Sequence, residues 1–410
     1  MDDDGRRFDT ARFDPAKHGP RQSRKRPRVF GDRQVPRWVY RVILILALSV
    51  LAVLGWMNRD NLAPSAVLEW VQGRVVGMGV GDGYPHSITG TSVQPKNFLS
   101  YDKNVYFAGD TAFTVLNSTA KELASRQHSL SSPVLKLGGG RALLYNLGGK
   151  GCQVESLGRT VSKFNASGNV VAGSVARQGG YALLTEADGY CGELTTYTAG
   201  GRERFHYWFS DYYPTAVALS PDGSRAAVAG VNAKEGQIVS AVYLLDLNSG
   251  KAQEPLAVYP GNLLFDAAWD GDGAVAVFGD RASVLVDAGS GKKTEYGYGG
   301  RQLSAYCSNE NGVVFGLSSY EGSSDSGLVV LNRAGGRVLS ERLSGEIRSV
   351  SAFGVTAAAL CGGRVYFYTA LPAGPAGSAD AGGDAKAVAL RDEKSAYVLG
   401  VSEIRLINRS

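Results

Sequence analysis

Residues 205–213, FHYWFSDYY, form the densest aromatic run in the chain, and exposed rings of this kind can stack against sugars or peptides. The candidate ligand-binding residues are Tyr207, Trp208, Tyr212 and Tyr213. The alternative is an outer β-strand whose rings pack between neighbouring sheets, because aromatic residues also favour strands. Packing is the more ordinary role, so these four residues are candidates and not an assigned site.

Patterns that would bind a metal ion are weak. His86, His128 and His206 are the histidines beyond the N-terminal tail, and they fall in different parts of the chain. The segment 270–273, DGDG, could present two carboxylates to calcium, but the EF-hand spacing and its distal glutamate are missing. A hairpin turn explains this segment better. The sequence therefore predicts no metal site.

The four cysteines, Cys152, Cys191, Cys307 and Cys361, show no CxxC or metal-type spacing. An even number of cysteines in an exported domain is compatible with disulfides. Cys152 and Cys191, however, occupy similar positions in neighbouring repeat units, which can hold their Cα atoms farther apart than the ~7 Å that a disulfide allows. We expect buried free thiols, with disulfides as the alternative.

Catalytic signatures are also missing, since the sequence contains neither a GxSxG elbow nor an HExxH pair. The sequence therefore predicts no catalytic residues and no cofactor.

A repeated strand pattern must position all of these residues. Residues 214–250 contain three short strand-like runs; the turn SPDG follows the first run and the turn NSG follows the third. Similar units recur about every forty residues. Units of four antiparallel strands and this WD40-like length build β-propellers. The sequence predicts an all-β propeller over 74–410, with eight blades preferred and seven as the alternative.

The two ends of the predicted propeller complement each other. The last unit, 386–408, supplies only three strands, whereas the extended segment 74–91 belongs to no complete unit. An open ring would leave unpaired strand edges, so we expect the segment 74–91 to pair beside 403–407. Between the last two units, 371–384 (LPAGPAGSADAGGD) is poor in large apolar residues and is expected to be a flexible insertion.

The N-terminal region differs from the rest. Residues 1–41 hold twelve Lys and Arg against six Asp and Glu, whereas the remainder holds 31 against 32, a near-neutral balance that argues against nucleic-acid binding. We expect a disordered, basic cytoplasmic tail over 1–37, one transmembrane helix over 38–57 and a stalk over 58–73.

The one-sided basic cluster favours a single-pass protein of the cell membrane whose N-terminus lies inside and whose propeller is extracytoplasmic. A cleaved signal peptide ending near 63–66 (APSA) is the rival interpretation, but the long charged segment that precedes the apolar run argues against it.

Several segments together resemble an uncharacterised family of membrane-anchored β-propeller proteins of Gram-positive, largely clostridial bacteria, catalogued as a domain of unknown function. The matching segments are GDGYPHSITG (81–90), PVLKLGGGRALLYNLGGKG (133–151), GGYALLTEADGY (179–190) and SAYVLGVSEIRLIN (395–408). The resemblance runs from the apolar segment to the C-terminus, excluding 371–384. It implies a propeller outside an anchor and carries no known activity or functional residues.

Two functions remain open. The first is a binding or scaffold module for a protein, peptide or glycan at the cell surface, since propellers present rigid faces lined by loops. The second is an extracytoplasmic enzyme, either a quinoprotein-like oxidoreductase or a hydrolase, with its site at the central channel. Two or more carboxylates converging with a histidine at the channel would favour the enzyme, and a Tyr-rich groove would favour the binding module.

Overall fold

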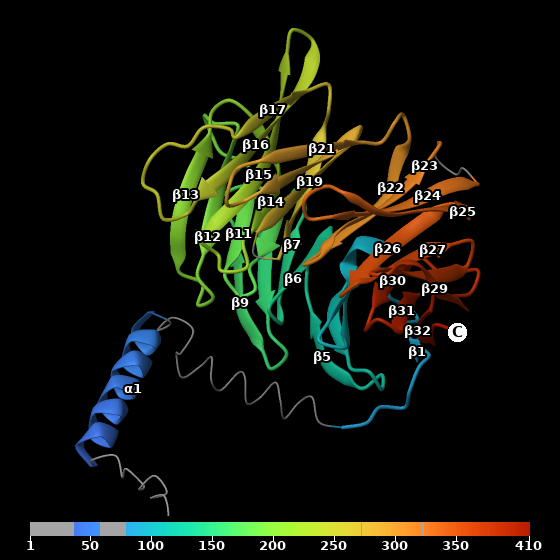
Figure 1. The fold of residues 1–410 in the computed structure, drawn as a ribbon, viewed down its shortest axis with the longest axis horizontal. Coiled ribbons are helices and arrows are strands. Elements are labelled where there is room, and N and C mark those ends of the chain that lie inside the picture. The colour runs from blue at the N-terminus through green and yellow to red at the C-terminus, as the bar shows by residue number, and fades with distance from the viewer. Residues whose placement is uncertain (1–36, 58–78, 272, 321–323) are drawn as a thin grey trace, which may run out of the picture. The chain divides into compact units, whose positions relative to one another are not determined.

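The computed structural model describes residues 37–57, 79–271, 273–320 and 324–410. The chain divides into two compact units, 1–57 and 58–410. In the second unit, eight four-stranded antiparallel sheets form the blades of a propeller, which confirms the predicted fold and the preferred number of blades (Figure 1). The first strands of several neighbouring blades contact one another, so these strands line the centre of the ring.

The first four blades follow the chain in order, after a short 3-10 helix η1 (Pro95–Asn97). Blade 1 contains β2 (Phe98–Tyr101), β3 (Asn104–Ala108), β4 (Ala112–Leu116) and β5 (Glu122–Gln127). Blade 2 contains β6 (Pro133–Gly138), β7 (Arg141–Asn146), β8 (Gly151–Glu155) and β9 (Thr160–Asn165). Blade 3 contains β10 (Val170–Val175), β11 (Tyr181–Thr185), β12 (Gly192–Tyr197) and β13 (Glu203–Phe209). Blade 4 contains β14 (Tyr213–Leu219), β15 (Arg225–Lys234), β16 (Gln237–Asp246) and β17 (Ala257–Pro260).

Blades 5 to 7 repeat the same order from the centre outwards. Blade 5 contains β18 (Leu264–Asp270), β19 (Ala274–Gly279), β20 (Ala282–Asp287) and β21 (Lys293–Gly297). Blade 6 contains β22 (Gln302–Asn309), β23 (Gly312–Ser318), β24 (Asp325–Asn332) and β25 (Arg337–Ser344). Blade 7 contains β26 (Ile347–Phe353), β27 (Thr356–Cys361), β28 (Arg364–Ala370) and β29 (Ala373–Asp380).

Blade 8 joins the two ends of the propeller. Its strands are β30 (Ala387–Leu390), β31 (Ser395–Leu399), β32 (Glu403–Asn408) and, at the outer edge, β1 (His86–Ser87) from the N-terminal side. His86 pairs with Ile404 and Ser87 with Glu403. The predicted exchange of a strand between the segments 74–91 and 403–407 is therefore confirmed.

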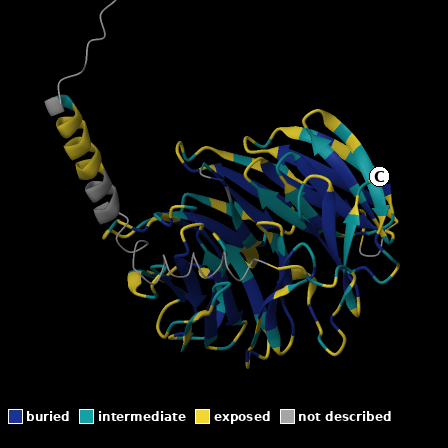
Figure 2. Ribbon diagram, turned by 90° about the horizontal axis from the view of Figure 1, so that it is seen from below, coloured by how far each residue is buried: buried dark blue, intermediate teal, exposed yellow. Residues whose placement is uncertain are grey.

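The hydrophobic core consists of layers between blades. Each of the eight clusters of buried residues found in the described part of the chain joins two neighbouring blades. Middle strands such as β19 (AVAVFG) are buried along their whole length, because both of their faces pack on a neighbouring sheet, whereas the outer strand β21 (KTEYG) alternates between exposed and half-buried residues. Figure 2 shows the buried residues in the sheets and the exposed residues mainly in the connecting loops.

The prediction of a flexible insertion over 371–384 is wrong. Residues Ala373–Asp380 form β29, the outer strand of blade 7, and pair with β28 along its length. An outermost strand is held mainly by its backbone hydrogen bonds, so small side chains suffice, and Pro375 is tolerated because it lies on an edge strand.

The N-terminal predictions have different outcomes. A helix, α1 (Arg37–Met57), coincides with the segment predicted over 38–57. Within the described ranges, no helix combines the length and the hydrophobicity that crossing a membrane requires, so the predicted membrane span lacks structural support. The predicted stalk, 58–73, and all but the last residue of the predicted tail lie outside the described residues.

Candidate functional site

The aromatic run predicted from the sequence divides between β13 and the start of β14. Strand β13 is the outermost strand of blade 3 and pairs with β12. Phe205, Tyr207 and Phe209 belong to the cluster of side chains between blades 3 and 4, where the Phe209 ring packs edge-on against Tyr243 with 5.2 Å between ring centroids. The intervening residues His206 and Trp208 point to the opposite side, because successive side chains of a strand alternate.

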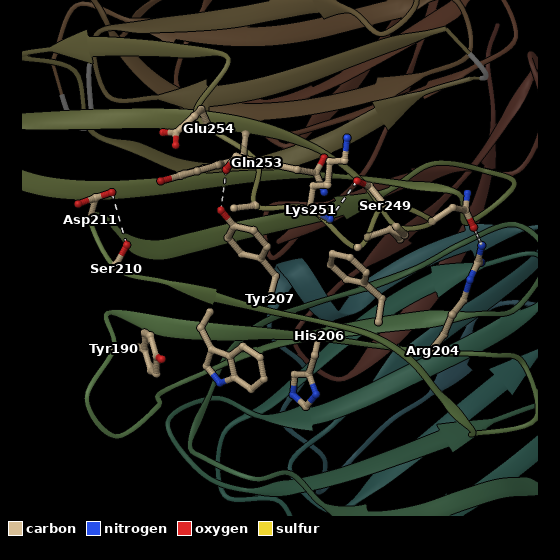
Figure 3. A pocket seen from close by; sticks show the side chains of 17 residues that line it. Tyr190, Arg204, His206, Tyr207, Ser210, Asp211, Ser249, Lys251, Gln253 and Glu254 are labelled. Carbon is tan, nitrogen blue, oxygen red and sulfur yellow. Dashed lines mark hydrogen bonds between the residues drawn. The ribbon is translucent and has the colours of Figure 1, made fainter.

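A groove of about 680 Å³ lies between β13 and the loop 247–254 that follows β16 (Figure 3). We call it the aromatic groove. Tyr207 crosses it and donates a hydrogen bond from its hydroxyl to the carbonyl oxygen of Gln253, at 2.6 Å. The residues that line the groove are Tyr190, Arg204, Phe205, His206, Tyr207, Trp208, Ser210, Asp211, Tyr243 and 247–254.

Exposed aromatic rings border the groove. Trp208 is 49% exposed and stacks on the His206 ring, with 4.9 Å between centroids and 10° between planes. Tyr190 is 51% exposed, and its ring centroid lies 6.1 Å from that of Trp208. Two neighbouring aromatic rings that are half exposed to water form an apolar patch, and such patches often mark a surface that a partner covers.

Polar neighbours hold the His206 ring in place. Its Nδ1 atom lies 2.9 Å from Oε1 of Glu203, and its Nε2 atom lies 2.9 Å from the Thr195 hydroxyl and in contact with the Glu193 carboxylate. These contacts fix the plane on which Trp208 stacks, so the exposed tryptophan is presented by a rigid support.

The two ends of the groove carry opposite charges. Figure 3 shows Asp211 and Glu254 at one end and Arg204 at the other, with Lys251 on the loop that forms the wall. The Arg204 guanidinium donates hydrogen bonds to the carbonyl oxygen of Gly223 at 2.8 Å and to Oδ1 of Asn248 at 2.7 Å, which hold it at the groove.

The four predicted binding residues do not lie together. Tyr207 and Trp208 line the groove, whereas Tyr212 is buried, packs against Tyr243 and accepts a hydrogen bond from Nζ of Lys234 at 3.1 Å. Tyr213 is 59% exposed but is not part of the groove lining. The sequence prediction missed Tyr190, Arg204 and the loop 247–254, which the fold brings to β13 over a long separation in sequence.

None of the four cysteines, all of which lie in the described part of the chain, forms a disulfide; Cys152 and Cys361 are buried, and Cys191 and Cys307 are partly buried. Burial raises the pKa of the Cys152 thiol to about 12, so this thiol stays protonated and unreactive at neutral pH.

His86, His128 and His206 belong to three different blades, and among the described residues no group of His, Cys, Asp and Glu could hold a metal ion. Strand β18 ends at Asp270 and β19 begins at Ala274, so the residues between them connect a hairpin, as predicted; Asp272 lies outside the described residues.

A second polar cluster lies inside the ring. Nζ of Lys136, on the first strand of blade 2, is 3.7 Å from Oδ1 of Asp266, on the first strand of blade 5. The Tyr306 hydroxyl, from blade 6, donates a 2.8 Å hydrogen bond to Oδ2 of Asp266. Because blades 2 and 5 are not neighbours, this ion pair spans the central channel. The Asp266 carboxylate raises the pKa of Lys136, so its ammonium group is protonated and is a poor nucleophile or base.

Comparisons with known proteins agree with the fold. Residues 84–370 match a family model described as "Family of unknown function (DUF5711)". No curated protein matches the chain. The solved structure of BamB from Moraxella catarrhalis is similar, with 12% identity, a TM-score of 0.50, and coverage of 81% of this chain and 98% of that one. A structure of a eukaryotic initiation factor is similar at 11% identity, with a TM-score of 0.51 and coverage of 81% and 87%. At these identities the likeness concerns the fold alone.

Proposed function

Because the chain belongs to the DUF5711 family of unknown function, we propose its role from the geometry of its site: it is a non-catalytic propeller that binds a partner through the aromatic groove of blade 3. The observation that carries this proposal is the exposed pair Trp208 and Tyr190 beside a groove of about 680 Å³, with Trp208 stacked on the fixed His206 ring. Exposed aromatic side chains beside a pocket are typical anchors of binding interfaces.

The competing enzymatic function needs groups that exchange protons or attack a substrate at the channel. The polar cluster there offers one carboxylate, Asp266, which already accepts a hydrogen bond from Tyr306 and pairs with the Lys136 ammonium group. A carboxylate neutralised in this way is better suited to bracing blades 2 and 5 than to catalysis. The geometry therefore favours the binding module over an oxidoreductase or a hydrolase.

The location of the propeller remains a proposal from the sequence. The basic cluster 21–28 precedes an apolar segment, and few basic residues follow it, which supports an N-terminus inside the cell and an external propeller. Protease added to intact protoplasts should then digest the propeller and spare the N-terminal 37 residues. Protection of the propeller would overturn this proposal.

Differential capture tests the binding function. The full chain, the Trp208→Ala/Tyr190→Ala variant and a Tyr320→Ala control are each used to capture proteins from surface-labelled source cells. Tyr320 is a matched control because its side chain is 62% exposed but lies outside the groove. We expect a partner that the wild type and the control retain and the groove variant loses at least tenfold. Equal capture by all three proteins would reject the groove as the binding site.

A further inference from the structure

The outer strand β13 differs from the outer strands of the other blades. It holds five consecutive residues, FHYWF (205–209), without a lysine, arginine, acidic residue or proline. The others are interrupted by charge or proline or are very short: ELASRQ, TVSKFN, AVYP, KTEYG, RVLSERLS, AGPAGSAD and the two-residue β1. Charges, prolines and short lengths protect edge strands from pairing with other chains. Blade 3 is thus the blade whose edge is left open to pairing.

We propose that β13 takes up an extended segment of a partner protein, which adds to blade 3 as a fifth strand within the aromatic groove. This inference rests on the proposed binding function and names the class of its ligand. Within blade 3, β13 is paired on one side, with β12, so alternate N–H and C=O groups of its other edge have no strand partner. Backbone hydrogen bonds along such an edge are the basis of peptide recognition by strand addition.

The groove supplies what such a peptide needs besides its backbone partners. Successive side chains of an added strand alternate between two faces. Those on one face would enter the space beside Tyr207, Tyr243 and the loop 247–254, and those on the other would lie beside Trp208 and Tyr190. The volume of about 680 Å³ lies within the range of roughly 300–1,000 Å³ that is usual for ligand pockets.

The charges specify the direction of the peptide. Asp211 and Glu254 at one end favour a basic residue, and Arg204 with Lys251 favours an acidic residue farther along the strand. A partner segment therefore combines a β-prone, apolar centre with opposite charges at its ends.

A second copy of this chain fits the groove less well than a single peptide does. Antiparallel pairing of two β13 strands would bring two loops of residues 247–254 to the same face of the joined sheet. Each loop already stands against its own β13, with the Gln253 carbonyl bound by Tyr207, so the two loops would crowd each other.

The first part of the test is a selection from a random dodecapeptide phage library on the immobilised full-length chain. Selected peptides are then measured by fluorescence anisotropy against the wild type, Trp208→Ala and the control Tyr320→Ala. We expect binding that weakens at least tenfold in Trp208→Ala and stays within twofold in Tyr320→Ala. A library that yields no peptide dependent on Trp208 would overturn the peptide proposal.

The second part distinguishes strand addition from side-chain stacking. A selected peptide is resynthesised with a single backbone N-methyl group at each position in turn. Strand addition predicts a two-residue periodicity: methylation at alternate positions weakens binding at least tenfold, and methylation at the positions between has little effect. Uniform or aperiodic effects would overturn strand addition.

The remaining outcomes separate this inference from the proposed function. If capture of a cellular partner depends on Trp208 but that partner is a glycan, or binds through a folded surface without an extended segment, the binding function stands and the peptide inference fails. If sedimentation shows a dimer that Trp208→Ala abolishes, the occupant is a second copy and the inference fails as well. If cellular capture is unaffected by Trp208→Ala, the proposed function itself fails.

Discussion

His86 and Ile404 lie opposite each other in the antiparallel pair of β1 and β32, although they come from opposite ends of the propeller. Ile404 is fully buried in the cluster between blades 8 and 1, together with Phe107 and Tyr397. Strand β32, on which β1 closes the ring, is thus also part of the hydrophobic core.

The first prediction concerns this closure. Ile404→Asp should lower the free energy of unfolding by several kcal/mol, because it buries an unpaired charge between two blades. Val401→Asp is the matched control, since Val401 is 57% exposed in the turn before β32, and it should change stability by less than about 0.5 kcal/mol. Urea unfolding measures both variants. Equal stability of Ile404→Asp and the wild type would show that closure does not depend on this contact.

The second prediction concerns the buried Glu155 carboxylate. Arg126 donates to its Oε2 atom at 2.8 Å and to the carbonyl oxygens of Ser156 and Leu157, which joins blades 1 and 2. Arg126→Ala should lower the free energy of unfolding by about 3–5 kcal/mol, because it leaves the Glu155 carboxylate buried without its positive partner. If the double variant Arg126→Ala/Glu155→Gln recovers most of the lost stability, the unpaired Glu155 charge is the cause of the loss.

The exposed pair Arg348 and Glu346, 3.8 Å apart, is the control for the second prediction. Arg348→Ala should cost less than about 1 kcal/mol, because solvent screens the charges of an exposed pair. Equal costs for Arg126→Ala and Arg348→Ala in chemical unfolding would contradict the argument.

The third prediction concerns pH. His128 is buried, with Nε2 3.2 Å from the Gly109 carbonyl oxygen. Burial lowers the pKa of His128 below the usual value of about 6.5, although the hydrogen bond with Gly109 and the charge of Asp110 act in the opposite direction. Because the pKa of His128 is lower in the folded chain, the unfolded chain binds the proton first as the pH falls. The contribution of His128 to folding stability is therefore complete above pH 6.5 and is lost as the pH falls through the pKa of the folded state.

Melting temperatures of the wild type and His128→Gln, compared between pH 7.5 and pH 5, test this prediction. The wild type should lose more stability than the variant over that interval. Parallel pH profiles would contradict the assigned role of His128.

The fourth prediction concerns β29. Deleting residues 371–384 and joining the ends through a short turn should lower the melting temperature by several degrees, because β29 pairs with β28 and because Ala381 is buried between blades 7 and 8. A milder variant, Ala381→Asp, should act in the same direction by burying a charge. A deletion variant with the same melting temperature as the wild type would show that this segment is a dispensable insertion.

The repeat pattern predicted the blades and their closure because it rests on local signals. Turns such as SPDG (220–223) and apolar strands such as AVAVFG (274–279) mark each blade within a few residues. The unequal number of strands at the two ends predicted the pairing of β1 with β32. Strand β29 was missed because its stability comes from pairing with β28, and its small residues carry no hydrophobic signal.

The candidate site could be predicted only in part. The aromatic run identified Tyr207 and Trp208, but composition does not reveal which rings of a strand face a neighbouring blade and which face solvent. Tyr212 and Tyr213 are adjacent in sequence, yet one is buried and the other exposed. The wall of the groove, 247–254, and the contact of Lys136 with Asp266 depend on long-range packing that no local pattern encodes.

The closing strand β1 also determines how the propeller responds to mechanical load. A pulling force applied from the N-terminal side acts first on the hydrogen bonds that Gly81 and Gly83 donate to Thr119, and then on the two residues of β1 and their pairing with β32, before it reaches any longer strand. Because the buried cluster between blades 8 and 1 lies directly behind this short strand, extraction of β1 would expose that interface while the other interfaces between blades stay closed. Tension at the N-terminal end of the ring is therefore borne by a few contacts with the turn that follows β4 and then by the shortest strand of the propeller.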